Sequence, residues 1–435
     1  MKVAIIADDL TGASDTGVQM ARHGLSASVL LDDRKMAETT SEVVAVDTDS
    51  RSVTGREAYR RVAEACESIL RLNEFDVIYK KIDSTMRGNI GSELDAVYHQ
   101  FKPDFIVTAP SFPHAGRVVR GGHMFVNGVP LHESEAARDP KNPVSRSYLP
   151  DVLREQTNRP AAVVTLKELR GEGGFVLETM QRYRMEQVPY LLFDAETEED
   201  LRRIVSIVRQ TGYRVVWAGS AALANALAGL QLRKDAKART LAIEKGPVCI
   251  VMGSVNAHSR KQLEHVLNSP GVIGIEACSE FLLEEPSKRR EFERMRNEAE
   301  EGMRSVPRAI VVYTSGNAED VQKARQAGAR MGMSAGEVSN EIGRALGEFA
   351  AGLISDRGIR NLVLTGGDTA KQVCLNLGAW EMILLGELEV GVPVGRLPGT
   401  EDRYVITKAG GFGSEQILNK ALEFFEHPIG KLSNF

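Results

Sequence analysis

The chain has 435 residues, more than one hydrophobic core usually serves, so its length predicts two domains. A formal net charge of -5 argues against a nucleic-acid partner, because proteins that bind nucleic acids present basic surface to the phosphates. No apolar stretch approaches the roughly 18 residues needed to span a bilayer, so we expect a cytoplasmic protein with no membrane partner.

The first half of the chain alternates apolar runs with helical segments. The opening run, 3–7, is continuously apolar, which is typical of a strand buried on both faces of a parallel sheet. The helical stretch that follows ends at Gly24. Further strands are expected at 26–31, 43–46, 76–79, 105–109, 161–165 and 214–218. This alternation predicts a mostly parallel α/β sheet flanked by helices.

A long stretch rich in proline and glycine, 110–150, interrupts this rhythm. Connections of that length are usually functional, so we interpret it as a lid or active-site insertion, with a surface excursion over a sheet edge as the equal alternative. It contains Arg117, Arg120 and three histidines, but no metal-binding spacing such as H-E-x-x-H. The composition therefore favours a ligand-binding loop.

A charged, non-periodic segment at about 233–246 is the best candidate for a linker. We therefore expect one domain at 1–232 and a second at 247–435. The second domain repeats the α/β pattern, with strands expected at 248–252, 309–313, 361–365, 382–385 and 404–407.

Charged residues follow three of the first-half strands. Asp8 and Asp9 come directly after the first strand, Arg51 follows the third, and "YKKIDSTMRG" occupies 79–88. Ligands of open parallel sheets bind beyond the carboxyl ends of the strands, where cations can hold a carboxylate and aspartates can accept from hydroxyls. A helix cap or a solvated loop would explain either motif alone, so that interpretation stays open.

Glycine-bearing turns follow three of the second-half strands. They are "MGSVNAHS" at 252–259, "TGGDTA" at 365–370 and "TKAGGFGSE" at 407–415. Backbone N–H groups in such turns can cradle phosphates at a helix start. Because the chain has neither a G-x-x-x-x-G-K-[ST] loop nor a G-x-G-x-x-G fingerprint, we expect a nucleotide site of a less common type.

Taken in order, "ADDLTGASDTG", "KKIDSTMRG", "TSGN" at 314–317, "TGGDT" and "KAGGFG" resemble the four-carbon acid sugar kinase family over nearly the whole chain. The resemblance implies a kinase that uses ATP and Mg²⁺ to phosphorylate the terminal (C4) hydroxyl of a four-carbon sugar acid. It also implies that the N-terminal domain holds the acid, that the C-terminal domain holds ATP, and that the active site lies in the cleft between them. The opening motif is similar to that of the threonate-type members, so we expect D-threonate, with D-erythronate or a 3-oxo-tetronate as alternatives. We allow for a homodimer.

The resemblance also assigns individual residues. The expected contacts to the sugar acid are Asp9, Arg51, Lys81, Ile82, Asp83 and Ser84. The expected contacts to ATP are Ser254, Gly366, Gly367, Asp368, Thr369 and Gly411. We expect Asp9 to orient or deprotonate the acceptor hydroxyl, with Asp8 in support and Asp83 as the rival base. Arg51 and Lys81 would hold the substrate carboxylate or neutralise the transferred phosphoryl group.

Two other classes of function use parts of the same sequence. A non-catalytic sensor of sugar acids would need only the N-terminal pocket, and it would bind its ligand without ATP. A dehydrogenase would use a doubly wound fold, but the missing dinucleotide fingerprint argues against it. The stereochemistry of the acid stays open, because epimers differ by a single hydroxyl.

Overall fold

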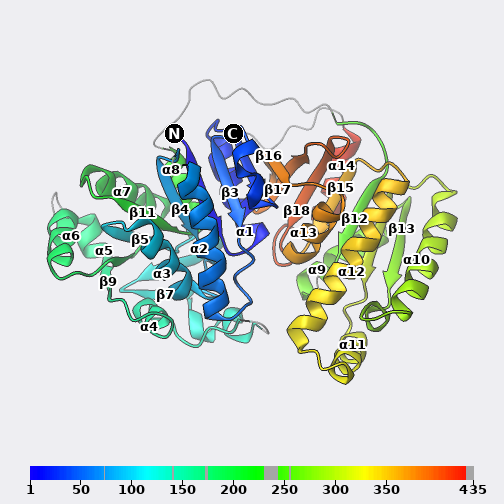
Figure 1. The fold of residues 1–435 in the computed structure, drawn as a ribbon, viewed down its shortest axis with the longest axis horizontal. Helices are drawn as coiled ribbons and strands as arrows, with labels where there is room; N and C mark the ends of the chain where they lie inside the picture. Colours follow the sequence, from blue (N-terminus) through cyan, green and yellow to red (C-terminus); the bar gives the residue numbers. More distant parts are fainter. Residues whose placement is uncertain (73, 140–141, 172–174, 230–242, 254–255, 428–435) are drawn as a thin grey trace. The chain divides into compact units, whose positions relative to one another are not determined.

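The computed structural model describes the chain except for residues 73, 140–141, 172–174, 230–242, 254–255 and 428–435. It divides into two compact units, Met1–Ala236 and Lys237–Phe435 (Figure 1). Most of the linker expected at 233–246 lies outside the described residues, and residues 243–246 form neither helix nor strand. The exact linker bounds stay a prediction.

A parallel sheet forms the centre of the N-terminal unit. Its strands lie in the order β2-β3-β1-β4-β11-β5-β10-β9, and neighbouring strands pair in parallel. The strands are β1 (Val3–Ala7), β2 (Ala27–Leu30), β3 (Val43–Asp47), β4 (Val77–Lys81), β5 (Phe105–Ala109), β9 (Ala161–Val164), β10 (Tyr190–Phe193) and β11 (Val215–Gly219). β1 is buried at every position, as expected of a strand covered on both faces.

The strand order reverses direction at β1. The chain leaves β1 through α1 (Leu10–Arg22) toward β2 on one side, and passes from β3 through α2 (Gly55–Leu72) to β4 on the other. Right-handed crossovers in opposite directions place these two helices on opposite faces of the sheet. Ligands of such sheets bind at the reversal, beyond the carboxyl ends of the strands. The segments that follow β1, β3 and β4 therefore lie side by side.

The remaining helices of this unit follow the strands in the α/β pattern (Figure 1). They are α3 (Ile90–Phe101), α4 (Leu149–Arg154), α5 (Leu166–Arg170), α6 (Phe175–Met185), α7 (Glu198–Gln210) and α8 (Ala221–Gly229). α1 packs against α8, and α2 packs against α3.

The described part of the 110–150 insertion has secondary structure of its own, which the sequence did not predict. It contains a small antiparallel sheet of β6 (Arg117–Arg120), β7 (His123–Val126) and β8 (Val129–Pro130). Val119 exchanges backbone hydrogen bonds of 3.0 and 3.1 Å with Ala195. The Asp194 carboxylate accepts from the backbone N–H groups of Gly121 and Gly122 at 2.7 and 2.8 Å. The insertion is thus fastened to the segment after β10.

The sheet of the C-terminal unit is mostly parallel. Its order is β13-β14-β12-β15-β18-β17-β16. Among the described strands of this unit, β17 alone runs in the opposite direction, antiparallel to β16 and β18, and the other neighbouring strands pair in parallel. The strands are β12 (Val248–Met252), β13 (Val272–Ala277), β14 (Ala309–Thr314), β15 (Asn361–Thr365), β16 (Glu381–Glu389), β17 (Val392–Leu397) and β18 (Arg403–Lys408). The order again reverses at the unit's first strand, β12, so the ends of β12, β14 and β15 are neighbours.

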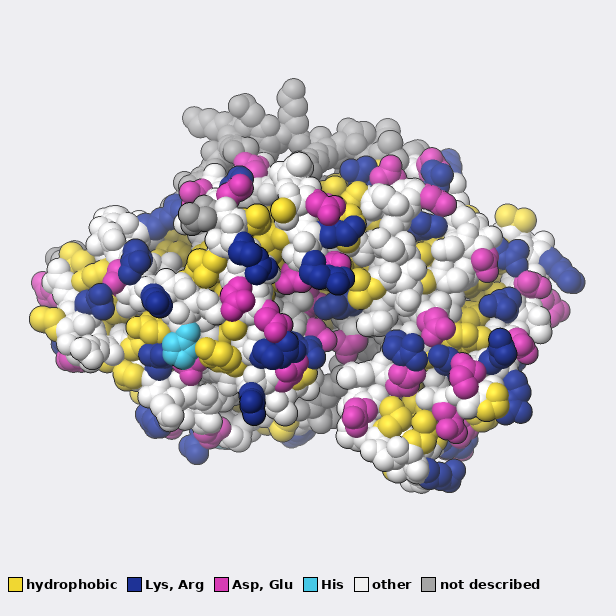
Figure 2. Space-filling model, viewed as in Figure 1, with side chains coloured by type: hydrophobic (Ala, Val, Ile, Leu, Met, Phe, Trp, Pro, Cys, Tyr) yellow, Lys and Arg dark blue, Asp and Glu magenta, His cyan; other side chains and the backbone are white. Residues whose placement is uncertain are grey.

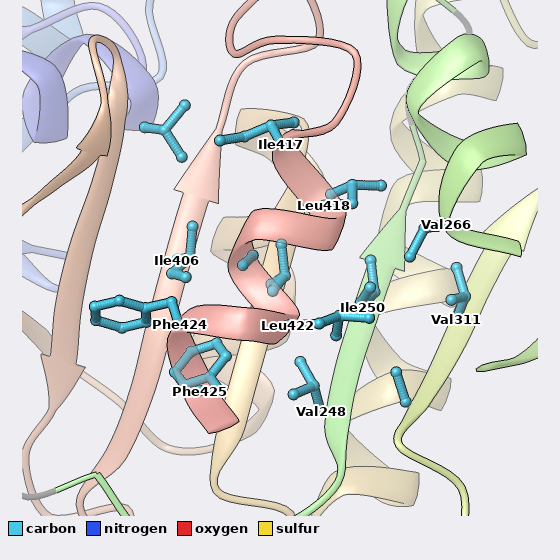
Figure 3. Packing of buried hydrophobic residues seen from close by; sticks show 14 of the residues in the cluster. Val248, Ile250, Val266, Val311, Ile406, Ile417, Leu418, Leu422, Phe424 and Phe425 are labelled. Atoms are coloured by element: carbon cyan, nitrogen blue, oxygen red, sulfur yellow. The ribbon is translucent and has the colours of Figure 1, made fainter. Parts of the chain in front are cut away.

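One face of this second sheet is covered by α9 (Ala257–Leu267) and α14 (Ile417–Glu426). Figure 3 shows Leu422 and Phe425 of α14 close to Val248 and Ile250 of β12 and Ile406 of β18, within one buried cluster. The other helices are α10 (Ser287–Met303), α11 (Ala318–Arg330), α12 (Ala335–Asp356) and α13 (Gly367–Asn376). The unit therefore has a continuous apolar core of its own.

The visible surface carries charges of both signs. In Figure 2, Lys and Arg side chains are interspersed with Asp and Glu side chains rather than gathered into a field of one sign. Such mixing is typical of an ordinary solvated surface. Within the described residues, no helix is both long enough and apolar enough to cross a membrane.

The α/β fold class and every strand expected from the sequence are confirmed, with bounds shifted by a few residues at most. Three strands of the main sheets were not predicted: β10, β13 and β17. β17 contains Pro393 and Gly395, which count against a strand in any sequence-based reading. It is nevertheless a strand because antiparallel partners on both sides pair with it.

Candidate active site

The carboxyl ends of β1 and β3 bring together Asp8, Asp9 and Arg51. The Asp8 carboxylate accepts from Arg51 Nε at 2.6 Å and from Arg51 Nη2 at 3.0 Å. Asp9 Oδ2 lies 2.5 Å from Arg51 Nη1. The second Asp9 oxygen accepts from the backbone N–H of Gly12 at 2.7 Å and so caps α1. One guanidinium therefore serves two adjacent carboxylates.

The two aspartates differ in their electrostatics. Burial would raise the pKa of Asp8, but the charge and hydrogen bonds of Arg51, with help from Lys80 and Lys81, hold it below its ordinary value. Burial raises the pKa of Asp9, and burial together with the smaller effect of the Asp8 charge outweighs the opposing charge of Arg51. The Asp9 side chain is 25% exposed, whereas that of Asp8 is 2% exposed. Asp9 is thus the carboxylate that can meet a ligand.

A buried ion pair lies beneath this site. Lys80 Nζ lies 2.8 Å from Glu93 Oε2, and both side chains are almost fully buried. The other Glu93 oxygen accepts from Ser50 Oγ at 2.6 Å, and Ser50 Oγ lies 2.7 Å from Thr48 Oγ1. This chain of contacts fixes the segment after β3, and thereby the Arg51 that it carries.

Lys81, the last residue of β4, lies at the start of α1. Its Nζ donates to the Ile82 carbonyl at 2.9 Å, and the side chain is 6% exposed. A Cβ at Gly12 would lie 3.1 Å from Lys81 Nζ and 2.7 Å from Asp9 Oδ1. Glycine at this position therefore lets the ammonium approach the Asp9 cap closely. The Ile82 side chain is fully buried, so Ile82 can offer a ligand only its backbone.

Asp83 is held by many donors. Its carboxylate accepts from Arg87 Nε and Nη2 at 2.8 and 2.9 Å, and from Thr85 Oγ1 at 2.5 Å. Burial would raise the pKa of Asp83, but the Arg87 charge and hydrogen bonds hold it well below its ordinary value. Arg87 also donates to Asp139 of the insertion at 2.9 Å. Because it is so strongly stabilised as an anion, Asp83 is a poor proton acceptor.

The insertion contributes Arg117 to the same place. Arg117 Nη1 donates to Ser84 Oγ at 3.0 Å, and its Nε is buried without a hydrogen-bond partner in the described part of the chain. Burial lowers the pKa of Arg117, with Asp83 opposing the shift and Arg87 adding to it. Arg51 and Arg87 are paired with carboxylates, whereas Arg117 has no ion pair within the described residues. Its guanidinium is therefore available to an anion.

In the C-terminal unit, the predicted "TGGDT" turn begins α13. Gly366 is its N-cap and has φ of 94°, a left-handed conformation that favours glycine. Gly367, Asp368 and Thr369 form the first turn, with Asp368 exposed and Thr369 buried. A side chain on Gly253, after β12, would collide with Thr369 Oγ1. Glycine at position 253 therefore lets the end of β12 lie directly against the first turn of α13.

The "KAGGFG" turn is held against the start of α9. Ser259 Oγ donates to the Gly410 carbonyl at 2.7 Å, and Gln262 Nε2 donates to the Phe412 carbonyl at 3.1 Å. Gly411 is exposed, and a Cβ there would meet nothing within 4 Å. Ser254, the other predicted contact, lies outside the described residues. The other residues predicted to contact ATP follow β15 and β18, which are neighbouring parallel strands.

The structure thus brings all the predicted sugar-acid residues to one edge of the N-terminal sheet. It also adds residues that the sequence did not single out: Glu93 as the partner of Lys80, and Arg117 as a member of the site. The sequence offered one signal for Arg117, its place in a long insertion rich in basic residues. Nothing in the sequence distinguishes Glu93 from the other acidic residues on helices.

Comparisons with known proteins cover nearly the whole chain. Residues 3–227 match the family of sugar-binding N-terminal domains, and residues 249–418 match the family of nucleotide-binding C-terminal domains. The chain is 33% identical over 430 residues to a D-threonate kinase of Salmonella typhimurium, with 98% of this chain and 99% of that protein covered. It is 30% identical over 440 residues to a D-erythronate kinase of Heliobacterium modesticaldum, with 99% of this chain and 98% of that protein covered.

A solved structure supports the fold. A crystal structure from Salmonella typhimurium LT2 superposes with a TM-score of 0.78 at 23% identity, and the superposition covers 97% of this chain and 98% of that chain.

Fold, site and matches together define a sugar acid kinase with a sugar-binding and a nucleotide-binding domain. The chain belongs to the four-carbon acid sugar kinase family, as its motifs predicted.

Proposed function

We propose that this kinase transfers the γ-phosphoryl group of ATP to the C4 hydroxyl of a four-carbon sugar acid, with D-threonate as the first candidate. Support for the substrate comes from the 33% identity to a D-threonate kinase, against 30% to a D-erythronate kinase. The observation that carries the proposed chemistry is the unequal pair of carboxylates after β1, of which Asp9 is partly exposed and has a raised pKa.

Asp9 is the proposed base. As the C4 oxygen attacks the γ-phosphorus and the bond to the bridging oxygen of ADP breaks, the hydroxyl proton passes to the Asp9 carboxylate. A raised pKa brings this carboxylate closer to neutral pH, where a base is more effective. Asp8 and Arg51 hold Asp9 in place, and the low pKa of Asp83 suits it to orienting Arg87 and the nearby hydroxyls.

The carboxylate of the acid is proposed to bind Arg117, with Lys81 and Ser84 beside it. A guanidinium matches a carboxylate through two parallel hydrogen bonds, and the Arg117 Nε has no partner in the described residues. The sequence predicts Arg51 for this role, but the three guanidinium nitrogens of Arg51 already contact Asp8 and Asp9. Arg51 therefore acts on the substrate through Asp9.

The proposed nucleotide contacts are the backbone of Gly366 and Gly367, the side chains of Asp368 and Thr369, and the loop at Gly411. The glycine turn at the start of α13 fits phosphate, because N–H groups at a helix start attract anions. Among the described residues, no group of three or more His, Cys, Asp or Glu side chains is placed to hold a metal. Mg²⁺ would accordingly arrive with ATP, held mainly by phosphates and water.

The proposal is tested by ADP release in a coupled assay with ATP, Mg²⁺ and a panel of D- and L-threonate, D- and L-erythronate and a 3-oxo-tetronate. We expect turnover with D-threonate to exceed that with the other acids. Preference for another acid on the panel would correct the substrate. Acid binding without turnover in the whole panel would indicate a non-catalytic sensor and contradict the proposal.

Replacing the base separates chemistry from folding. Asp9→Asn keeps a good helix cap but cannot accept the proton, so we expect kcat to fall by at least about 100-fold with little change in thermal stability. Asp32→Asn is the matched control, because Asp32 also caps a helical turn and pairs with an arginine, Arg34. An Asp9→Asn enzyme with kcat near wild type would rule out the base role.

Removing the guanidinium of Arg117, which has no ion pair among the described residues, should weaken binding of the acid but not of ATP. For Arg117→Met we expect KM for the acid to rise by roughly ten- to a hundredfold, because the substrate loses a hydrogen bond to a charged group. KM for ATP should be unchanged. Arg120→Met, on the same hairpin but exposed and paired with Glu196, should leave both constants unchanged. Equal KM values for the acid in the wild type and Arg117→Met would exclude Arg117 from the substrate site.

A further inference from the structure

Lys408, the last residue of β18, is a buried amine without a partner. Its residue exposure is 1%, and its Nζ has no hydrogen-bond partner within the described part of the chain. Burial alone lowers the pKa of Lys408 to about 8, and no nearby carboxylate opposes the shift. At neutral pH this side chain is still mostly an ammonium, although the described residues of the ligand-free protein offer its charge no compensation.

Lys80 provides the comparison within the same chain. It is as deeply buried as Lys408, yet its Nζ pairs with Glu93 at 2.8 Å and donates to the Lys81 carbonyl at 2.8 Å. Burying an ionised amine without such partners is costly. The fold pairs the ammonium of Lys80 with a carboxylate but gives the ammonium of Lys408 no partner among the described residues. This difference suggests that a bound ligand supplies the counter-charge of Lys408.

The position of Lys408 indicates which kind of ligand would supply the missing counter-charge. Val363 and Ile406 are paired in register and belong to the cluster beneath α9 and α14. Thr365 and Lys408 come two residues after Val363 and Ile406, and they are also paired in register. Because alternate residues of a strand share a face, Thr365 and Lys408 lie on the same face as the cluster, at the carboxyl ends of the strands. Thr365 Oγ1 is likewise buried without a partner among the described residues. Two adjacent polar groups therefore lack partners at one place.

That place adjoins the proposed nucleotide site. The Gly366 N–H donates to the Lys408 carbonyl at 2.9 Å, so the "TGGDT" turn begins beside Lys408. The glycine loop that follows Lys408 is held by the first turns of α9. Lys408 thus stands at the start of one glycine turn and beside another that begins a helix. This combination suits a polyphosphate, which takes a lysine as a point charge and N–H groups as donors.

We propose that Lys408 binds the phosphate chain of the nucleotide, so that the ligand supplies the missing counter-charge. This inference rests on the proposed function, because it assumes that the C-terminal unit takes ATP. It adds a residue that the motif comparison did not assign to ATP. The alternative is an amine that merely fills space in the core, in which case its charge would have no effect on the nucleotide.

The test is Lys408→Met in the full chain, which keeps the length of the side chain and removes its charge. By calorimetry without the acid, we expect affinity for ATP to fall by roughly ten- to a hundredfold. Inorganic tripolyphosphate should compete with ATP on the wild type and fail to do so on the variant. The thermal midpoint of the ligand-free protein should stay the same or rise, because an uncompensated charge has been removed.

Two controls sharpen the result. Lys80→Met should lower the thermal midpoint, since it leaves Glu93 buried without its partner. Lys323→Met removes one exposed charge from the C-terminal unit and should leave ATP affinity unchanged.

Each outcome decides the matter. Wild-type ATP affinity in Lys408→Met would overturn the inference, while turnover of the acid panel by the wild type would leave the proposed function standing. A large fall in the thermal midpoint of Lys408→Met would show that the resting fold already compensates the ammonium, and would also overturn the inference. A wild type that neither binds ATP nor turns over any acid would overturn both proposals.

Discussion

The N-terminal site depends on one arginine that serves two adjacent carboxylates. Arg51 binds Asp8 through two hydrogen bonds and Asp9 through a third contact, so one positive charge is divided between two negative ones. At Asp8 the charge and hydrogen bonds of Arg51, with help from Lys80 and Lys81, overcome burial, so this carboxylate stays a firmly ionised anchor. At Asp9 burial and the Asp8 charge outweigh Arg51, so the pKa rises. Two identical side chains, adjacent in sequence, are thereby suited to different tasks, one structural and one chemical.

The scaffold beneath the site keeps this arrangement in place. β1 lies between β3 and β4, so the aspartates, Arg51 and the segment after Lys81 converge without any long-range loop. The Lys80–Glu93 pair and the hydroxyls bonded to it brace the segment that carries Arg51. The C-terminal unit uses the same device, with its strand order reversing at β12 and its glycine turns meeting beside that strand. Each unit thus places its candidate site close to the point where its own strand order reverses.

Much of this arrangement could be predicted because it follows from local patterns. Continuous apolar runs predicted the parallel strands, and the charged or glycine-rich turns after these strands predicted the candidate sites. β13 escaped prediction because Gly274 interrupts its apolar character, and β17 because of its proline and glycine. The small sheet of the insertion could not be predicted, because it depends on contacts between residues that are distant in sequence, such as that of Asp194 with Gly121.

The least predictable features were those that depend on pairing. In the sequence, Arg51 and Arg117 are two arginines of the N-terminal half that both lie outside the predicted strands. Only the structure distinguishes Arg51, which is bound to carboxylates, from Arg117, which has no ion pair among the described residues. Lys408 stood inside a recognised motif, but its lack of a partner is a property of burial in three dimensions. A sequence gives the identity of a charged residue, while its role depends on what else lies within a few ångströms.

The claim that Asp9 is the reactive carboxylate is tested most directly by the pH dependence of kcat/KM with the preferred acid. A base must be ionised to work, so an aspartate with a raised pKa gives an acidic limb above the ordinary aspartate value of about 3.9. The account predicts that limb, on a profile corrected for ionisation of the substrate. An acidic limb shifted below the ordinary value, as the strongly stabilised Asp83 would give, or no acidic limb at all, would contradict it.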